Sequence, residues 1–121
     1  MTQDLTVRDR DRTLAFRGVE LARASSARPD KARWIELELH RVEGDGEVRY
    51  VLAGQGRSAL PGEHTRYWAH QCASAAGVLE QLYMFDGDGT RYLTNVARQL
   101  LAAASEHDPE LDAARALERV A

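Results

Sequence analysis

Two neighbouring stretches of the chain alternate between apolar and polar residues, and this alternation limits the possible folds more than any other feature. Residues 33–42 and 48–53 both show a period of two, which is typical of strands with one buried face. The residues between them include Glu43-Gly44-Asp45-Gly46, a composition that favours a tight turn. The pattern therefore predicts a β-hairpin over Arg33 to Ala53.

The pairing register of this hairpin follows from the need for apolar faces to meet, because a slip of one residue moves every side chain to the other face. Pairing Val42 with Val48 would set Tyr50 opposite His40, which mixes the faces. Pairing Val42 with Glu47 keeps them apart, and we predict that register. The expected apolar face holds Ile35, Leu37, Leu39, Val48, Tyr50 and Leu52, and the expected polar face holds Trp34, Glu36, Glu38, His40, Arg49 and Val51.

Two further strands flank the hairpin in the sequence. We expect one over residues 13–24, with a bulge at Gly18 that brings its apolar residues to one side of the sheet. The other is expected over residues 64–72, after a long glycine-containing connection over residues 54–63. The pattern of residues 64–72 leaves open which of its faces is buried.

Three helices are expected in the second half of the chain. Ser74 is a typical N-cap residue before a short apolar-periodic stretch. The strongest helical signal begins at Thr90, and Asp108 followed by Pro109 predicts the start of a third helix. The middle helix has its apolar residues at helical spacing: Leu93, Val96, Ala97, Leu100, Leu101 and Ala104.

Together these elements predict an α+β fold of two layers, in which a mainly antiparallel sheet of about four strands carries two to three helices on one face. Residues 1–12 alternate Asp and Arg with few apolar side chains, so we expect a flexible charged segment there. Residues 13–121 are expected to form a single domain, because a chain of 121 residues can bury one core.

The distribution of charge bears on the class of partner. The formal net charge is −3, with eight Lys+Arg against five Asp+Glu in residues 1–34 and eight against fourteen in residues 35–121. The acidic total disfavours nucleic acid as a partner, although the basic first part suits a partner-binding arm as well as a solvated tail. A single cysteine and the lack of a membrane-length apolar run favour a cytoplasmic protein without membrane contact.

Residues 84–90 read Met-Phe-Asp-Gly-Asp-Gly-Thr, which resembles the first motif of haloacid-dehalogenase-type phosphatases. The resemblance implies Asp86 as nucleophile and Asp88 as general acid, with magnesium between them. Only 31 residues follow Thr90, too few for that family's other motifs. A calcium loop beginning at Asp86 needs a glutamate at its twelfth position, where Ala97 stands. We therefore expect a turn between two helices.

Other chemical groups give no stronger signal. His64, His70 and Cys72 share one face of a predicted strand, but a fourth zinc ligand is lacking and the spacing matches no common zinc finger. Cys72 as a nucleophile would need a base such as His70, and a buried inert cysteine is far commoner. The sequence therefore predicts no catalytic residue, no metal ligand and no cofactor.

Trp34 is the most notable candidate for binding, because it lies on the expected polar face. In the predicted register His40 and Arg49 are its neighbours, and the three would form an aromatic and cationic patch. Such a side chain is either covered by another segment or presented to a partner, and Trp and Arg dominate many protein interfaces.

The order of strand, hairpin, Gly-Arg loop, aromatic strand and helix over residues 33–95 resembles a WGR domain, a nucleic-acid-binding module. The pattern falls on Gly56, Arg57, Gly62, Trp68 and the helix over residues 76–83. The resemblance implies Arg57 as a nucleic-acid contact, although Gln55 replaces the signature tryptophan.

Three functions follow in order of support. The first is a non-enzymatic protein-interaction module or accessory subunit, which binds a protein partner or a second copy through the face around Trp34 and the N-terminal arginines. The alternative is a WGR-like module that binds nucleic acid through Arg57 and the same arginines. The third is an enzyme that uses Asp86 and Asp88, or His70 and Cys72. The first is preferred because no catalytic constellation stands out.

Overall fold

The computed structural model describes residues 2–120, with side chains described through residue 117. Its main sheet is antiparallel with the strands in sequence order: β1 (Gln3–Asp9), β2 (Arg12–Ser25), β3 (Arg33–Val42), β4 (Tyr50–Ser58) and β5 (Arg66–Cys72). The helices are α1 (Ala75–Leu82), α2 (Asn95–Ser105) and α3 (Pro109–Val120), and the hairpin of β6 (Met84–Phe85) and β7 (Arg91–Tyr92) separates α1 from α2. The predicted α+β class is confirmed, with five strands in the main sheet where about four were expected.

The additional strand is β1, which occupies the segment predicted to be flexible. That prediction is wrong for Gln3–Asp9, because these residues pair along β2 and place Leu5 and Val7 opposite Phe16 and Leu14. Val7 is buried. Two apolar residues in a charged segment are thus enough to form a strand when a neighbouring strand supplies the hydrogen bonds.

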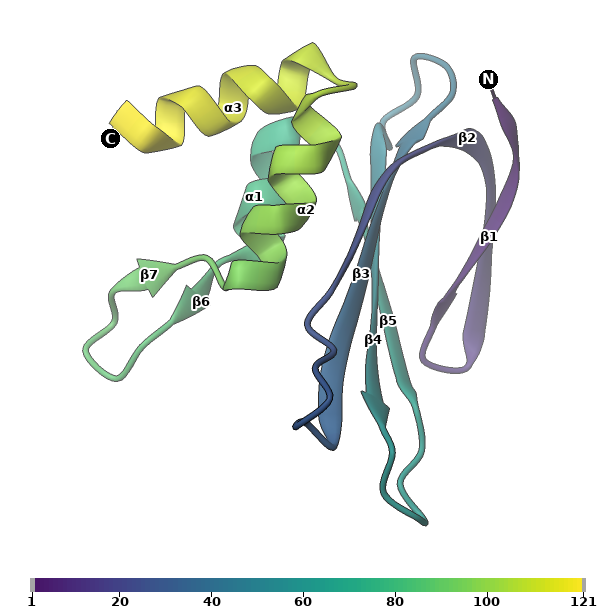
Figure 1. Ribbon diagram of the computed structural model, residues 1–121. Coiled ribbons are helices and arrows are strands. Elements are labelled where there is room, and N and C mark those ends of the chain that lie inside the picture. The colour runs from purple at the N-terminus through teal and green to yellow at the C-terminus, as the bar shows by residue number, and fades with distance from the viewer. Residues whose placement is uncertain (1, 121) are drawn as a thin grey trace.

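The sheet curls until its first strand meets its last. Figure 1 shows β2 arching away from the helices, so that β1 lies over the opposite side of β3–β5. The backbone N–H of Arg10 donates to the carbonyl of Tyr67 at 2.9 Å, and Asp9 Oδ1 accepts the N–H of Ala69 at 3.3 Å. These bonds join the two edges, and the inner side of the curl becomes an enclosed concave face.

The bulge that permits this curl lies at Leu21, not at the predicted Gly18. Leu14 and Phe16 consequently face the concave side, whereas Val19 and Leu21 face the helices, so the expectation that all four share one side is wrong. Gly18 has a different role, because a Cβ there would lie 2.2 Å from the carbonyl oxygen of Arg41.

The sheet therefore has an apolar cluster on each side. The cluster facing the helices is the larger, with Leu37, Leu39, Tyr50, Leu52, Cys72, Val78, Leu79, Val96, Ala97, Leu100, Leu101 and Leu111 among its buried members. The concave cluster comprises Val7, Val51, Ala53 and Ala69, with Leu14, Phe16, Val42 and Val48 packed against it. Val51, predicted on the polar face, thus lines an apolar interior. The prediction that Val48 shares the face of Tyr50 and Leu52 is wrong, because Val48 lies in the loop before β4 and packs against the apolar cluster on the concave side.

The central hairpin forms, but its register differs from the predicted one by two residues. Leu39 pairs with Leu52 and Leu37 with Gly54, and the connecting loop runs over 43–48. A shift of two preserves the side to which each strand residue points. The observed register fits the packing of Trp68 over Gly54, where a Cβ would lie 2.4 Å from the indole ring.

The predicted helix starts are confirmed at two places. Ser74 Oγ accepts the N–H of Gly77 at 3.1 Å, and Asp108 Oδ1 accepts the N–H of Glu110 at 3.0 Å. The middle helix begins at Asn95 instead of Thr90, because the residues before it pair as β7. Its predicted apolar face is confirmed as core.

The segment predicted as a long connection, residues 54–63, is strand in its first half, since β4 continues to Ser58; the connection itself runs over residues 59–65, before β5 begins at Arg66. On β5, Trp68 and Cys72 pack on the helix side and Ala69 on the concave side. Within the described residues, every helix is too short or too polar to cross a membrane.

Candidate functional site

Three large apolar side chains are exposed on the β6–β7 hairpin, with Met84 and Tyr92 on one of its faces and Phe85, opposite Arg91, on the other. Met84, Phe85 and Tyr92 are 50%, 68% and 41% exposed, and Met84 lies opposite Tyr92 in the register. Figure 1 shows that this hairpin extends away from the sheet and the helices. A group of exposed apolar side chains on a projecting element is typical of a contact surface.

A groove of about 460 Å³ lies at the base of this hairpin. Its lining combines apolar and cationic side chains: Leu79, Tyr83, Tyr92, Leu93 and Leu101 with Arg91, Arg98 and Arg115. The guanidinium of Arg91 lies 4.3 Å from the ring centroid of Tyr83. We call the three exposed apolar residues and this groove the hairpin surface.

The tip of the hairpin is acidic, and the Asp and Gly residues of the phosphatase-like motif form its turn. Asp86 Oδ1 accepts the N–H groups of Asp88 and Thr90, each at 3.1 Å, and Asp88 Oδ1 accepts that of Thr90 at 2.9 Å. Gly89 has φ of 87°, which favours glycine. The predicted turn between two helices is therefore confirmed, and it places two exposed carboxylates at the tip.

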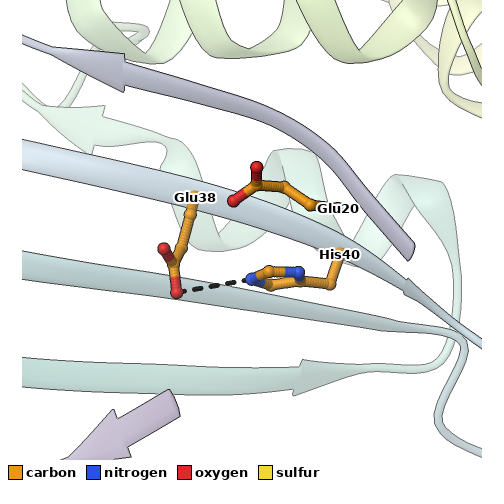
Figure 2. A group of neighbouring side chains, drawn as sticks. All are labelled: Glu20, Glu38 and His40. Carbon is orange, nitrogen blue, oxygen red and sulfur yellow. Dashed lines mark ion pairs between the residues drawn. The ribbon is translucent and has the colours of Figure 1, made fainter. Parts of the chain in front are cut away.

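A second unusual site lies on the concave face, where charged side chains gather inside the curl. Figure 2 shows Glu20 of β2 beside Glu38 and His40 of β3. Glu20 pairs with His40 in the register, and Arg23 pairs with Glu38. Because the bulge at Leu21 falls between Glu20 and Arg23, both point to the concave side. We call Glu20, Arg23, Glu38 and His40 the concave cluster.

His40 is the most buried member of the concave cluster, at 3% exposed. Its ring meets that of Phe16 edge to face, with centroids 5.4 Å apart. Nε2 lies 3.3 Å from Glu38 Oε1, but the geometry satisfies no hydrogen bond, and neither ring nitrogen has a hydrogen-bond partner among the described residues. A buried polar atom without a partner costs about 1–3 kcal/mol.

The two carboxylates of the concave cluster share one cation. Arg23 Nη1 lies 3.1 Å from Glu38 Oε2, and Arg23 Nε contacts Glu20 Oε1. The pKa of the Glu38 carboxyl is lowered, mainly by the polar contact with His40 Nε2, which is close at 3.3 Å although misaligned for a full hydrogen bond; burial opposes this effect and the charge of Arg23 adds to it. Glu38 is therefore held as an anion inside the curl.

The concave cluster borders a cavity of about 430 Å³ between β1 and the inner side of the sheet. Arg23 and Glu38 line it, together with Arg8, Glu36, Gln55 and Tyr67. Ions and small polar molecules thus have a route to the carboxylate of Glu38.

Two of the predicted site residues, Trp34 and Arg57, are brought together at the far end of β3 and β4. They are register partners, and the Arg57 guanidinium lies 5.9 Å from the Trp34 ring centroid. Trp34 Nε1 donates to Glu36 Oε2 at 2.9 Å, so this half-buried indole already has its hydrogen bond.

The other two predicted residues are elsewhere, and the expected patch of Trp34, His40 and Arg49 does not form. His40 is enclosed on the concave face, while Arg49 Nη2 donates to Glu110 Oε1 of α3 at 2.8 Å. Arg49 lies at the loop end of the hairpin and Trp34 at the opposite end, about 25 Å away along the strand.

The remaining motifs do not assemble a site. Cys72 is buried on the helix side, where desolvation raises the pKa of its thiol, which disfavours the reactive thiolate. Within the described residues, only Glu20, Glu38 and His40 form a group of three potential metal ligands, so His64 and His70 do not join Cys72 in one.

Sequence reasoning missed Glu20 and the exposed residues of the hairpin. Met84-Phe85 before an Asp-Gly turn and Tyr92 after it are the signal that would have predicted this hairpin. Comparison of the chain with protein-family models, curated proteins and solved structures finds no match.

Proposed function

We propose that this protein is a non-enzymatic interaction module whose partner is a second copy of the chain, bound through the hairpin surface. The observation that carries the proposal is the exposure of Met84, Phe85 and Tyr92 on a projecting hairpin. Complete burial of an apolar side chain of this size contributes about 1.5–3 kcal/mol, and the exposed fractions of these three leave part of that free energy unrealised. A partner surface recovers that free energy.

Charge complementarity favours a second copy over an unrelated protein. Each protomer has an acidic tip at Asp86 and Asp88, and cationic side chains in its groove at Arg98 and Arg115. In a twofold-symmetric dimer the same surface of each protomer serves both halves of the contact. The acidic tip of one hairpin then lies against the arginines of the other groove.

The apolar part of this contact supplies the affinity and the charged part fixes the register. Phe85 is the most exposed of the three apolar side chains on the hairpin and is the expected anchor, because aromatic side chains that fill a pocket dominate interface energetics. Leu79 and Leu101 give the groove an apolar floor suited to an aromatic ring.

Sedimentation velocity across a range of protein concentrations tests the proposal. The wild-type chain should sediment as a concentration-dependent dimer, and Phe85→Ser should weaken dimerisation by at least about tenfold. Leu60→Ser is the matched control, because Leu60 is also an exposed large apolar residue but lies in the loop after β4. A wild-type monomer at every concentration would refute the dimer, and equal effects of the two substitutions would refute the hairpin surface as its interface.

A charge exchange tests the predicted orientation. Arg98→Glu should weaken the dimer by placing a carboxylate opposite the acidic tip, and the added substitution Asp88→Arg should restore part of the affinity. If the double variant regains no affinity, the acidic tip does not lie against the groove of the other protomer. The existence of the dimer is tested separately, by sedimentation of the wild-type chain.

A second candidate function is nucleic-acid binding at the end of the sheet around Trp34. The observation in its favour is a groove of about 650 Å³ whose lining includes Lys31, Arg33, Trp34, Arg57 and Arg66. The WGR resemblance assigns Arg57 the same role. Glu36 and Glu63, which pair with Arg57 and Arg33, oppose phosphate binding.

Binding of labelled single-stranded and double-stranded oligonucleotides at several salt concentrations tests this second candidate. A phosphate-binding site requires affinity that falls steeply with salt and drops on Arg57→Gln. Absence of binding at low salt would exclude it.

A further inference from the structure

We infer that Glu20, Glu38 and His40 form a binding site for a divalent transition-metal ion, with Zn²⁺ as the best-suited ion. One donor atom from each of these side chains lies within 4.8 Å of the other two. The three come from adjacent strands, and Figure 2 shows their side chains on the same side of the sheet. None of these three residues belongs to the hairpin surface through which the dimer is proposed to form.

The distance between His40 Nε2 and Glu38 Oε1 matches the distance between two ligand atoms of one tetrahedral metal ion. Two ligand atoms bound about 2.1 Å from a tetrahedral ion are about 3.4 Å apart. His40 Nε2 and Glu38 Oε1 are 3.3 Å apart without a hydrogen bond between them. The separation suits an ion that both atoms contact better than it suits a direct bond.

Glu20 completes the set with a small movement. Its side chain is one-third exposed, so it has room to change rotamer and bring an oxygen closer to the other two donors. Arg23 contacts Oε1 of Glu20 and Oε2 of Glu38, which holds one oxygen of each carboxylate and leaves the other available.

The charge of the concave cluster also calls for a cation. Two carboxylates face a single guanidinium inside the curl, so one negative charge is left without a cationic partner in the cluster. Burial makes that charge costly, and a divalent ion offsets it. The buried imidazole gains a ligand bond in place of the hydrogen bonds that it lacks.

The donor types select among ions. One imidazole nitrogen with two carboxylates suits Zn²⁺ or a neighbouring transition metal, whereas Mg²⁺ and Ca²⁺ prefer oxygen donors alone. Three protein ligands leave a fourth position for water, and the adjoining cavity of about 430 Å³ gives the ion a way in.

Calorimetric titration of the full chain with Zn²⁺ alone, after treatment with a chelator and dialysis, tests the inference. We expect one ion per chain, and an affinity for Mg²⁺ at least a hundredfold weaker. His40→Gln and Glu20→Gln should each weaken Zn²⁺ binding at least tenfold. Glu20→Gln keeps the result interpretable if His40→Gln fails to fold, because Glu20 is the more exposed ligand.

Two matched controls separate this site from adventitious binding. Glu36→Gln changes a carboxylate on the concave side of the same strand outside the proposed ligands, and His70→Gln changes a histidine on the other side of the sheet. Both should keep the Zn²⁺ affinity within about twofold. Lack of binding by the wild-type chain, or binding that survives Glu20→Gln and falls with His70→Gln, would overturn the inference.

Arg23→Gln gives the sharpest contrast with a purely structural ion-pair network. The Arg23 guanidinium neutralises part of the negative charge that would attract the ion, and it contacts both ligand carboxylates. Its removal should therefore raise the Zn²⁺ affinity at least threefold. An affinity that stays level or falls would overturn the competition between Arg23 and the ion.

Discussion

The hairpin surface and the concave cluster depart from the usual distribution of side chains in opposite ways. The hairpin surface leaves Phe85 and Met84 in water, whereas the concave cluster encloses His40 and Glu38. Apolar side chains normally gain by burial, and charged or polar ones normally lose by it. Each region therefore carries a free-energy cost in the isolated chain.

The two regions need different kinds of partner. Contact with another apolar surface relieves the cost at the hairpin, and a cation relieves the cost at the concave cluster. A third region shows that burial of charge alone does not indicate binding. Asp108 is buried too, but Arg41, Tyr50 and two backbone N–H groups donate to its carboxylate.

Asp108→Ala should produce the largest loss of stability in this set, about 3–5 kcal/mol, because it removes the partner of a partly buried Arg41 and the cap of α3. Arg41 Nη1 lies 2.7 Å from Asp108 Oδ2. Chemical denaturation measures the change, and Asp112→Ala, an exposed acid of the same helix, is the control. Equally small effects of the two substitutions would show that the hydrogen bonds to Asp108 do not stabilise the fold. Asp108 could then not serve as the example of a satisfied buried charge.

Leu100→Ala should destabilise the chain by about 2–5 kcal/mol, because Leu100 is fully buried between α2 and the sheet. Phe85→Ala removes a larger side chain, yet should change the stability of the monomer by less than about 0.5 kcal/mol. Both are measured by denaturation at a concentration below that of dimerisation. A large loss for Phe85→Ala would mean that the hairpin belongs to the core of the monomer.

His40→Leu should stabilise the chain by about 1 kcal/mol in the presence of a chelator, the opposite sign to most core substitutions. The substitution removes two buried nitrogens without hydrogen-bond partners and adds apolar contact with Phe16. Thermal melting measures the change. A loss of more than about 2 kcal/mol would show that the imidazole makes a stabilising contact and would weaken the contrast between the two regions.

The exposed pair of Arg33 and Glu63 gives the smallest effect and a reference for an ordinary surface contact. Hydrogen bonds from Arg33 and Ser58 lower the pKa of Glu63 to about 2, with Arg33 Nε 2.9 Å from Glu63 Oε1. A lowered pKa contributes stability above the usual value of 4.5, and this is lost as the pH falls toward 2. NMR titration should show the low midpoint in the wild type and a return toward 4.5 in Arg33→Gln; similar midpoints in both would contradict the pairing.

The part of the fold that the sequence predicted is the part with strong periodicity. Leu100 and Leu39 were assigned to the core because apolar residues recur at helical or alternate spacing, and Ser74 was assigned as a cap. The curl escaped prediction because it depends on a one-residue bulge at Leu21 and on β1, whose only apolar support is Leu5 and Val7.

The candidate sites were harder to predict for the same reason. Because the curl was not predicted, Glu38 and His40 were assigned to a polar face and His40 to a binding patch with Trp34, although their alternation with Leu37 and Leu39 was assigned correctly. Trp34 was expected to meet Arg49, but the two lie at opposite ends of the hairpin, and Trp34 pairs with Arg57. The predicted register itself had Trp34 opposite Gln55, so the miss came from treating residues eight positions apart along the hairpin as neighbours. The hairpin surface was not predicted because β6 and β7 have only two residues each, too few for an alternating pattern to show in the sequence.

Hydrogen exchange at low and high protein concentration tests whether the hairpin surface is the dimer interface, since it reports which backbone segments a partner covers. We predict that exchange over residues 84–92 and around Arg98 slows as the concentration rises, while exchange over residues 59–65, the loop after β4, stays unchanged. Concentration-independent exchange over residues 84–92, or protection that appears only around Trp34, would contradict the assignment of the hairpin surface as the interface.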